Sequence, residues 1–478
     1  MNENRAVKIA FVAALLFCLL PFIVQSLAVL AYRYEADDSE GVVLNQGWQI
    51  LHGEDIYGRI DRYPFVTAVY PPLFPLAAAL MIKLAGPRLL AGRLISFFSS
   101  LLLLLILFFV IKKKTAGYLP SLLCVSLLVS LFPFQNWACL CRVDLLAILF
   151  SFSALAVYLL AGESVLADEV IAGLMLLGLF TKQTALAVPA TLLLHLIFTG
   201  KGKRAARIFL PLFALFASVF SLLLLITQGR YFSHTVLYVA NAYSLPDALA
   251  IFWRTICNYP LFAVLAAALT FDSARKKDLL FPVYLAASFL VGLLSGKTGA
   301  NYNFWLEFCI GFSVLASLAA ARVMDRPEVR AFSASSRSVF LLAVAAQLLF
   351  ASNYWLISRD YQNNLRTLSG EGDFISSFIK TVPGPVLTET AGLSILNGKP
   401  FLLEPFGMKV LAEEGLWDES PVLRDLNAQK FDLIAIKSNK GERSSRFTPK
   451  MLAAMKAHYV RLAVSPHWEL LRPRDRKL

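Results

Sequence analysis

Residues 9–30 read IAFVAALLFCLLPFIVQSLAVL, an apolar run of 22 residues without a charged side chain. About 20 such residues in a helix cross the roughly 30 Å hydrocarbon core of a bilayer. Similar uncharged runs cover residues 94–111 and 208–225. Of the 478 residues, 58% are hydrophobic and 16% are charged, against roughly 45–50% and 25% in soluble proteins. The composition predicts a multi-pass α-helical membrane protein whose first run stays as an anchor, because no small-residue cleavage pattern follows it.

The hydrophobic pattern predicts eleven transmembrane helices. They are expected at about residues 9–31, 94–111, 118–133, 145–161, 165–180, 184–199, 208–227, 257–271, 279–295, 304–321 and 338–357. With a cytoplasmic N-terminus, all but one of the cytoplasmic connections are basic, as the positive-inside rule requires. The net charge of +13 is explained in this way, and no nucleic-acid partner is expected.

The remaining segments are expected on the outer side. The apolar stretch at 70–84 opens with three prolines and is too short to span, so we expect a helix at the outer interface. Residues 41–51 predict a short amphipathic helix lying flat there. The sequence thus divides into a membrane domain at 1–357, with a first outer loop at 33–93 that carries interfacial helices, and a small extracytoplasmic α/β domain at 358–478. In that domain, extended runs at 385–387, 401–403, 432–436 and 459–464 alternate with helical patterns at 375–379, 408–414 and 449–458.

An acidic cluster follows the first predicted span. Residues 34–40 read YEADDSE and hold Glu35, Asp37, Asp38 and Glu40. Carboxylates this close repel one another beside a membrane, which raises some of their pKa values and makes one of them a candidate general base. The alternative is a solvated acidic turn without a chemical role.

Cations and two further acids occupy the outer ends of later spans. Arg142 and Asp144 lie at the outer end of the fourth span, and Lys182 lies in a short hairpin between two apolar helices. Lys297 lies in a glycine-containing loop that suits a phosphate, and Glu307 follows one turn into the next helix. Charges at membrane depth are functional candidates. The alternatives are that the cations reach into lipid headgroups and that Glu307 forms a structural pair with Lys297 or Arg142.

Several short motifs stand in a fixed order along the outer face: GEDIY at 53–57, YPPL at 70–73, RVD at 142–144, KQTA at 182–185, then Asn301-Tyr302 and Glu307. Together with the acidic pair at 37–38, they resemble the polyprenyl-phosphate-dependent glycosyltransferases of the GT-C fold. The resemblance is to the branch of protein O-mannosyltransferases and aminoarabinose transferases (glycosyltransferase family 39), and it covers about residues 5–355.

The resemblance implies an enzyme that moves a sugar from a polyprenyl-phosphate donor to an acceptor at the outer face. The donor's lipid tail is implied to lie between helices beside the membrane lipids, with its phosphate at the outer surface, and the acceptor is a lipid, a glycan or a protein. The implied location is the bacterial inner (plasma) membrane. Asp37 or Asp38 is the implied base; the family often has Asp-Glu where this chain has Asp-Asp. The implied substrate-binding residues are Glu40, Tyr57, Tyr70, Arg142, Asp144, Lys182, Gln183, Lys297, Asn301, Tyr302 and Glu307.

Inverting transfer needs a base for the acceptor proton and fixed positive charge for the departing phosphate. A divalent metal, Mg²⁺ or Mn²⁺, can supply part of that charge at a carboxylate cluster, but the sequence holds no ligand set that requires a cofactor. The six cysteines show neither metal-ligand nor disulfide spacing. The alternative function is a transporter or flippase of a lipid-linked saccharide, which predicts charged residues along the spans; they are scarce there, and no internal repeat is present.

Overall fold

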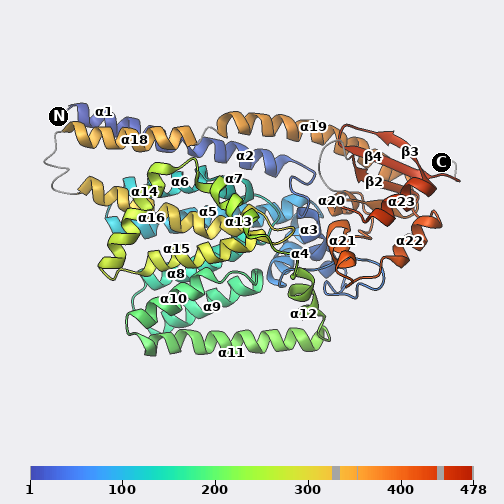
Figure 1. Ribbon diagram of the computed structural model, residues 1–478, viewed down its shortest axis with the longest axis horizontal. Helices are drawn as coiled ribbons and strands as arrows, with labels where there is room; N and C mark the ends of the chain where they lie inside the picture. Colours follow the sequence, from blue (N-terminus) through green and yellow to red (C-terminus); the bar gives the residue numbers. More distant parts are fainter. Residues whose placement is uncertain (1, 326–333, 352–353, 439–445, 476–478) are drawn as a thin grey trace.

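The computed structural model describes residues 2–325, 334–351, 354–438 and 446–475. Long helices form a bundle at one end of the molecule, and a small α/β domain lies at the other (Figure 1). The bundle helices are α1 (Asn2–Phe17), α2 (Leu19–Ala31), α5 (Leu89–Thr115), α6 (Tyr118–Ser130), α8 (Asp144–Leu160), α9 (Val165–Thr181), α10 (Ala187–Phe198), α11 (Gly202–Ile226), α14 (Pro260–Arg275), α15 (Leu280–Gly292), α16 (Leu306–Asp325) and α18 (Ala334–Ala351).

A helix occurs at each of the eleven places where a span was predicted, although residues 352–353 of the last one lie outside the described residues. Within the described ranges, four helices are long and apolar enough to cross a membrane: Arg5–Ala31, Leu89–Thr115, Gly202–Ile226 and Tyr302–Met324. A fifth is counted if α14 and the preceding α13 (Leu245–Ile256), which meet at 105°, form one bent span. Six shorter apolar helices accompany them. The multi-pass helical membrane fold is therefore confirmed, while the number of spans stays a prediction.

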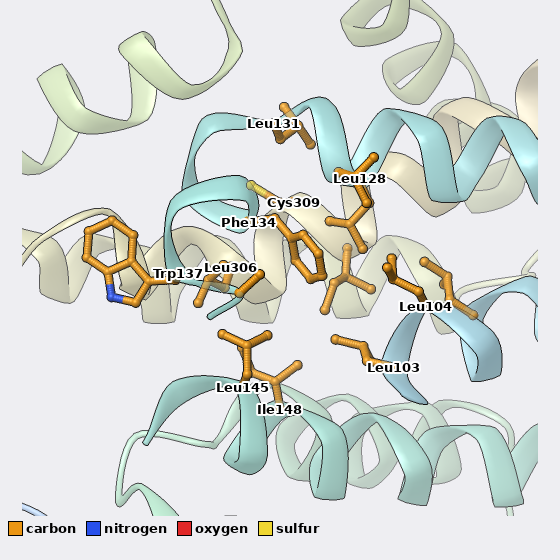
Figure 2. Packing of buried hydrophobic residues seen from close by; sticks show 14 of the residues in the cluster. Leu103, Leu104, Leu128, Leu131, Phe134, Trp137, Leu145, Ile148, Leu306 and Cys309 are labelled. Atoms are coloured by element: carbon orange, nitrogen blue, oxygen red, sulfur yellow. The ribbon is translucent and has the colours of Figure 1, made fainter. Parts of the chain in front are cut away.

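The interior of the bundle is mostly apolar. Figure 2 shows Leu103 and Leu104 of α5 facing Leu128 of α6, with Leu145 of α8 and Leu306 of α16 closing the layer. All five are less than a tenth exposed. In contrast, apolar side chains of α11 such as Phe213 and Leu225 are 60% and 76% exposed. Exposed apolar faces on long helices are what a surrounding bilayer would cover.

Shorter elements cover the end of the bundle that faces the α/β domain. They are α3 (Glu40–Leu51), α4 (Leu73–Ala85), α7 (Phe132–Trp137), α12 (Arg230–Thr235), α13 and the 3₁₀ turns η1 (Leu237–Val239), η2 (Leu293–Gly296) and η3 (Tyr302–Trp305). The helix α3 does not lie flat on a surface as its pattern suggested. Most of its residues are buried, because Gly47 lets it approach α4 so closely that a Cβ there would be 3.0 Å from Ala78 Cβ.

The C-terminal domain is a four-stranded sheet with helices on both faces. Its elements are α19 (Tyr354–Thr381), β1 (Val386–Thr388), α20 (Ala391–Leu396), α21 (Pro405–Glu413), α22 (Ser420–Asn427), β2 (Leu433–Lys437), α23 (Pro449–His458), β3 (Tyr459–Val464) and β4 (Trp468–Pro473). The strand order is β1-β2-β4-β3, with only β1 and β2 parallel. Alternate strand residues face α21–α23 on one side and α19 and α20 on the other.

Two details differ from the sequence prediction. The domain boundary expected at residue 358 falls inside α19, which is helical from 354 to 381. The extended run at 401–403 joins no sheet strand. Instead Leu403 bridges Phe65 of the first loop, where Phe65 N donates to Leu402 O at 2.8 Å. Its partner is therefore the membrane domain, so this segment ties the C-terminal domain to the first loop.

Candidate active site

A cavity of about 210 Å³ lies where the bundle, the first loop and the C-terminal domain meet. The bundle end supplies Arg142, Lys182 and Lys297, and the first loop supplies Tyr70. The remaining lining includes α3, the turn after α12 and the start of α21. Residues from widely separated parts of the chain thus surround one space beside the apolar bundle.

Two of these cations are joined through one buried carboxylate. Lys182 Nζ donates to Asp144 Oδ1 at 2.6 Å, and Arg142 Nε lies 3.9 Å from Asp144 Oδ2. Arg142 also donates to Asp37 Oδ1 at 2.9 Å and to Tyr70 Oη at 3.2 Å. Arg142 and Lys182 are 8% and 7% exposed. Burial opposes the charge of Arg142, but Tyr70, Asp37 and Asp144 outweigh it and raise its pKa, so Arg142 is a fixed cation.

A smaller cavity of about 20 Å³ continues from this group into the bundle. Asn303, which the sequence analysis did not select, donates to Asp144 Oδ1 at 2.8 Å, and the Phe304 ring lies 4.2 Å from Lys182 Nζ. Among the described residues, Glu307 Oε1 has no hydrogen-bond partner, and no ion pair joins Glu307 to Lys297 or Arg142. The space suffices for one water.

The two adjacent aspartates have different partners. Asp37 contacts Arg142 of the bundle. Asp38 forms ion pairs with Lys437 and, at 3.1 Å, with Arg446, both of the C-terminal domain. Neighbouring side chains in a turn point in different directions, and here one faces the bundle and the other faces the C-terminal domain.

Glu40 does not line the cavity. It joins the two backbone segments that carry Asp37 and Arg142. Its carboxylate accepts hydrogen bonds from Arg93 Nε at 2.8 Å and from Arg93 Nη2 at 2.7 Å. Both side chains are fully buried. It also accepts from Ala36 N and Cys141 N, each at 2.8 Å. Burial acts to raise the pKa of Glu40, but the Arg93 guanidinium outweighs it and lowers that pKa. Arg93 was not among the predicted site residues, although its position beside the apolar run at 94–111 was a visible signal.

Within the acidic cluster at 34–40, the buried carboxyl group with a raised pKa is that of Glu35. Burial raises its pKa to about 8, and its Oε1 accepts from Gly392 N at 2.8 Å. It lies against the start of α20 and is not among the residues that line the cavity. The raised pKa expected in the acidic cluster therefore belongs to a residue that contacts the C-terminal domain.

Two other predicted residues line the cavity. Gln183 Nε2 donates to Val69 O at 2.9 Å and to Thr235 O at 3.1 Å. Lys297 Nζ lies 3.3 Å from Val239 O, and its backbone forms a bridge with Tyr243. These contacts hold both side chains in place, facing the same space as Arg142.

The remaining three have other surroundings. Tyr57 is buried and donates from its Oη to Tyr70 O at 2.9 Å, which holds the turn that carries Tyr70. Asn301 Oδ1 accepts from Tyr302 N at 2.8 Å as the cap of η3. The Tyr302 ring packs edge-on against Phe132, with centroids 4.7 Å apart. None of the three lines the cavity.

The acidic cluster does not fit a resident divalent metal. Within the part of the chain that the structure describes, no three His, Cys, Asp or Glu side chains are grouped to hold one. Asp37, Asp38 and Glu40 are each paired with a cation, so the charge that a metal would supply already comes from Arg and Lys. The six cysteines are all free thiols.

No protein-family model matches the sequence, and no curated protein matches it either. Solved structures do match. ArnT from Cupriavidus metallidurans, bound to undecaprenyl phosphate, has a TM-score of 0.63 and 14% identity over 97% of each chain. The archaeal oligosaccharyltransferase AglB from Archaeoglobus fulgidus, with an inhibitory peptide and a dolichol-phosphate, has a TM-score of 0.54 and 12% identity over 88% of this chain and 69% of its own. The same oligosaccharyltransferase in complex with Zn and sulfate gives 0.54 and 13% over 89% and 67%.

Identities this low establish the fold alone. Because the match to ArnT extends over nearly the whole of both chains, it includes the helical bundle and the C-terminal domain. This chain therefore shares the fold of ArnT and of the oligosaccharyltransferase AglB, the GT-C fold that its motif order implied.

Proposed function

We propose that this protein is a glycosyltransferase that moves a sugar from a polyprenyl-phosphate donor to an acceptor at the outer face of the membrane. One observation carries the proposal: Arg142, Lys182 and Lys297 line a single cavity, and Asp37 contacts the first of them at 2.9 Å. The fold supports it further, because the similar ArnT was solved with undecaprenyl phosphate and AglB with a dolichol-phosphate.

The proposed chemistry uses the two kinds of charge in sequence. The bond between the sugar C1 and the phosphate oxygen breaks, and its electron pair stays on the polyprenyl phosphate. Arg142, Lys182 and Lys297 stabilise that growing negative charge in a partly dry site. The acceptor hydroxyl forms the new bond to C1 from the opposite side and gives its proton to a carboxylate. The transfer is then inverting, and the sugar is a hexose or a pentose.

Asp37 is the better candidate for the base. It faces the bundle cations through Arg142, where the phosphate is proposed to bind. Asp38 is held by Lys437 and Arg446, which belong to the C-terminal domain and not to the bundle. When a phosphate takes over the guanidinium of Arg142, Asp37 becomes free to accept a proton.

The proposed orientation puts the cavity outside the cytoplasm. At the far ends of α5 and α8, Lys113 Nζ donates to Leu160 O at 3.0 Å, and nearby Lys201 pairs with Glu163. Basic residues thus gather at the end of the bundle away from the cavity. Since basic connections stay in the cytoplasm, the C-terminal domain is extracytoplasmic and the N-terminus cytoplasmic in a bacterial inner membrane.

The test uses the full chain in lipid nanodiscs with undecaprenyl-phosphate sugars and an extract of envelope lipids, glycans and proteins as acceptors. Release of undecaprenyl phosphate is followed over time. We expect Asp37→Asn to lower turnover by about 100-fold or more and Asp38→Asn by less than about ten-fold. Asp55→Asn is the control, because Asp55 pairs with Arg230 outside the cavity lining.

Full turnover in Asp37→Asn would reject the proposed base. Absence of wild-type turnover with every donor, together with transport of labelled sugar lipid across vesicles, would replace the enzyme by the flippase alternative.

A further inference from the structure

One cavity residue is buried without any hydrogen bond. Gln46 of α3 is 1% exposed and lines the 210 Å³ cavity. Neither its Nε2 nor its Oε1 has a hydrogen-bond partner among the described residues. An unpaired buried amide costs free energy, and native proteins rarely keep one without a use. A ligand in the cavity is the natural partner.

Two further amide oxygens share this state. Gln183 Oε1 and Asn241 Oδ1 are buried atoms with no partner in the described ranges, and both residues line the same cavity. Their orientations follow from their neighbours. Gln183 Nε2 faces the carbonyls of Val69 and Thr235, and Asn241 Nδ2 faces Thr298 O at 3.0 Å. Carbonyls only accept hydrogen bonds, so the amide nitrogens must face them and the oxygens stay free.

The three side chains together offer free acceptors at three positions and a free donor at one. All three are uncharged, unlike the other lining residues Arg142, Lys182, Lys297, Arg446 and Glu404. Free acceptor oxygens require a ligand that carries hydrogen-bond donors, and they repel carboxylates. Sugar hydroxyls donate and accept at once, so two neighbouring hydroxyls can satisfy both ends of the Gln46 amide.

We propose that Gln46, Gln183 and Asn241 form the subsite that binds the hydroxyl-bearing sugar of the donor, while the cations bind the phosphate. This inference rests on the proposed glycosyltransferase function. Gln46 is the specificity-determining residue of the three, because its amide has no other contact to keep.

The helix that carries Gln46 is held rigidly. A Cβ on the next residue, Gly47, would be 3.0 Å from Ala78 Cβ, and one on Gly41 would overlap Glu35 Oε1 at 1.7 Å and Gly392 N at 2.3 Å. Close backbone approach on both sides leaves α3 little freedom, so the amide is preorganised and binding costs little ordering.

The test is Gln46→Met in the full chain, with Gln46→Leu as a second apolar replacement. Methionine has a similar length and no amide. Affinities for two kinds of lipid are measured by competition binding. The lipids are undecaprenyl phosphate alone and undecaprenyl phosphate carrying glucose, mannose or arabinose. We expect Gln46→Met to lower the affinity for the sugar-loaded lipid about ten-fold, as the loss of two neutral hydrogen bonds implies. Its affinity for the bare lipid should change less than about two-fold.

Stability supplies an independent measurement. Without ligand, Gln46→Met is expected to unfold at the same temperature as wild type or higher, because it removes an unpaired buried amide. A purely structural glutamine would give the opposite sign. The control is Gln49→Met, since Gln49 is buried in the same helix but does not line the cavity; it should leave both affinities unchanged.

Unchanged affinity of Gln46→Met for the sugar that wild type prefers would overturn the subsite, as would equal wild-type affinity for bare and sugar-loaded lipids. Failure of wild type to bind bare undecaprenyl phosphate would instead remove the proposed function, and the inference with it.

Discussion

The buried pair between Glu40 and Arg93 is expected to position both partners of the Asp37–Arg142 contact. Glu40 accepts from Ala36 N, one residue before Asp37, and from Cys141 N, one residue before Arg142. Arg93 adds bonds to backbone carbonyls at the end of α2. The perturbation that tests this arrangement is Glu40→Gln, which keeps the shape of the side chain and removes its charge.

The expected cost follows from burial. Both side chains are 0% exposed, and removal of one partner of a buried ion pair costs about 3–5 kcal/mol because the other charge remains unpaired. The neutral amide can still form a hydrogen bond with one neighbour, so we expect Glu40→Gln to lower the free energy of unfolding by about 3 kcal/mol. Turnover should fall by roughly 100-fold if Asp37 or Arg142 moves by about 1 Å.

Thermal unfolding of the purified protein and the undecaprenyl phosphate release assay provide the measurements. The matched control is Arg33→Met, because Arg33 and Asp373 form a pair that is 61% and 57% exposed and is worth at most about 1 kcal/mol. If Glu40→Gln unfolds at the temperature of wild type and keeps full turnover, as Arg33→Met should, then Glu40 does not position the site.

Three further outcomes are expected. Burial raises the pKa of Glu35 from 4.5 to about 8, so its stabilising contribution is full below about pH 4.5 and is lost as the pH rises toward 8. Glu35→Gln should flatten the fall of the unfolding temperature between pH 5 and 8, and an unchanged slope would contradict the docking role. Gly299 has φ +82°, and a Cβ there would lie 2.8 Å from Phe406 Cε1, so Gly299→Ala should cost about 1–2 kcal/mol and raise the donor KM; an unchanged KM and melting temperature would show that the loop adapts. Lys113→Cys should resist membrane-impermeant thiol reagents in intact cells while Glu54→Cys reacts, and labelling at position 113 would reverse the proposed orientation.

Much of the fold was readable from local patterns. Apolar runs of 9–31 and 94–111 predicted helices that the structure contains as Arg5–Ala31 and Leu89–Thr115, because the length of an uncharged run is a property of the sequence itself. The helix expected at 449–458 is α23, Pro449–His458. The prediction of a sheet strand at 401–403 was wrong because pairing depends on a distant partner. Leu403 bridges Phe65, which is more than 300 residues away.

In the site, too, the residue types were predictable from the sequence, whereas their contacts were not. Its ingredients, an acidic turn and cations at the outer ends of spans, were visible in order along the sequence, because charge beside an apolar run is costly wherever the chain folds. Only the tertiary structure decided that Asp37 meets Arg142 while Asp38 meets Lys437, that Glu40 pairs with Arg93, and that Gln46 faces the cavity. These partners lie between 53 and 399 residues apart, so the packing of distant elements, and no local preference, selects which polar group each side chain meets.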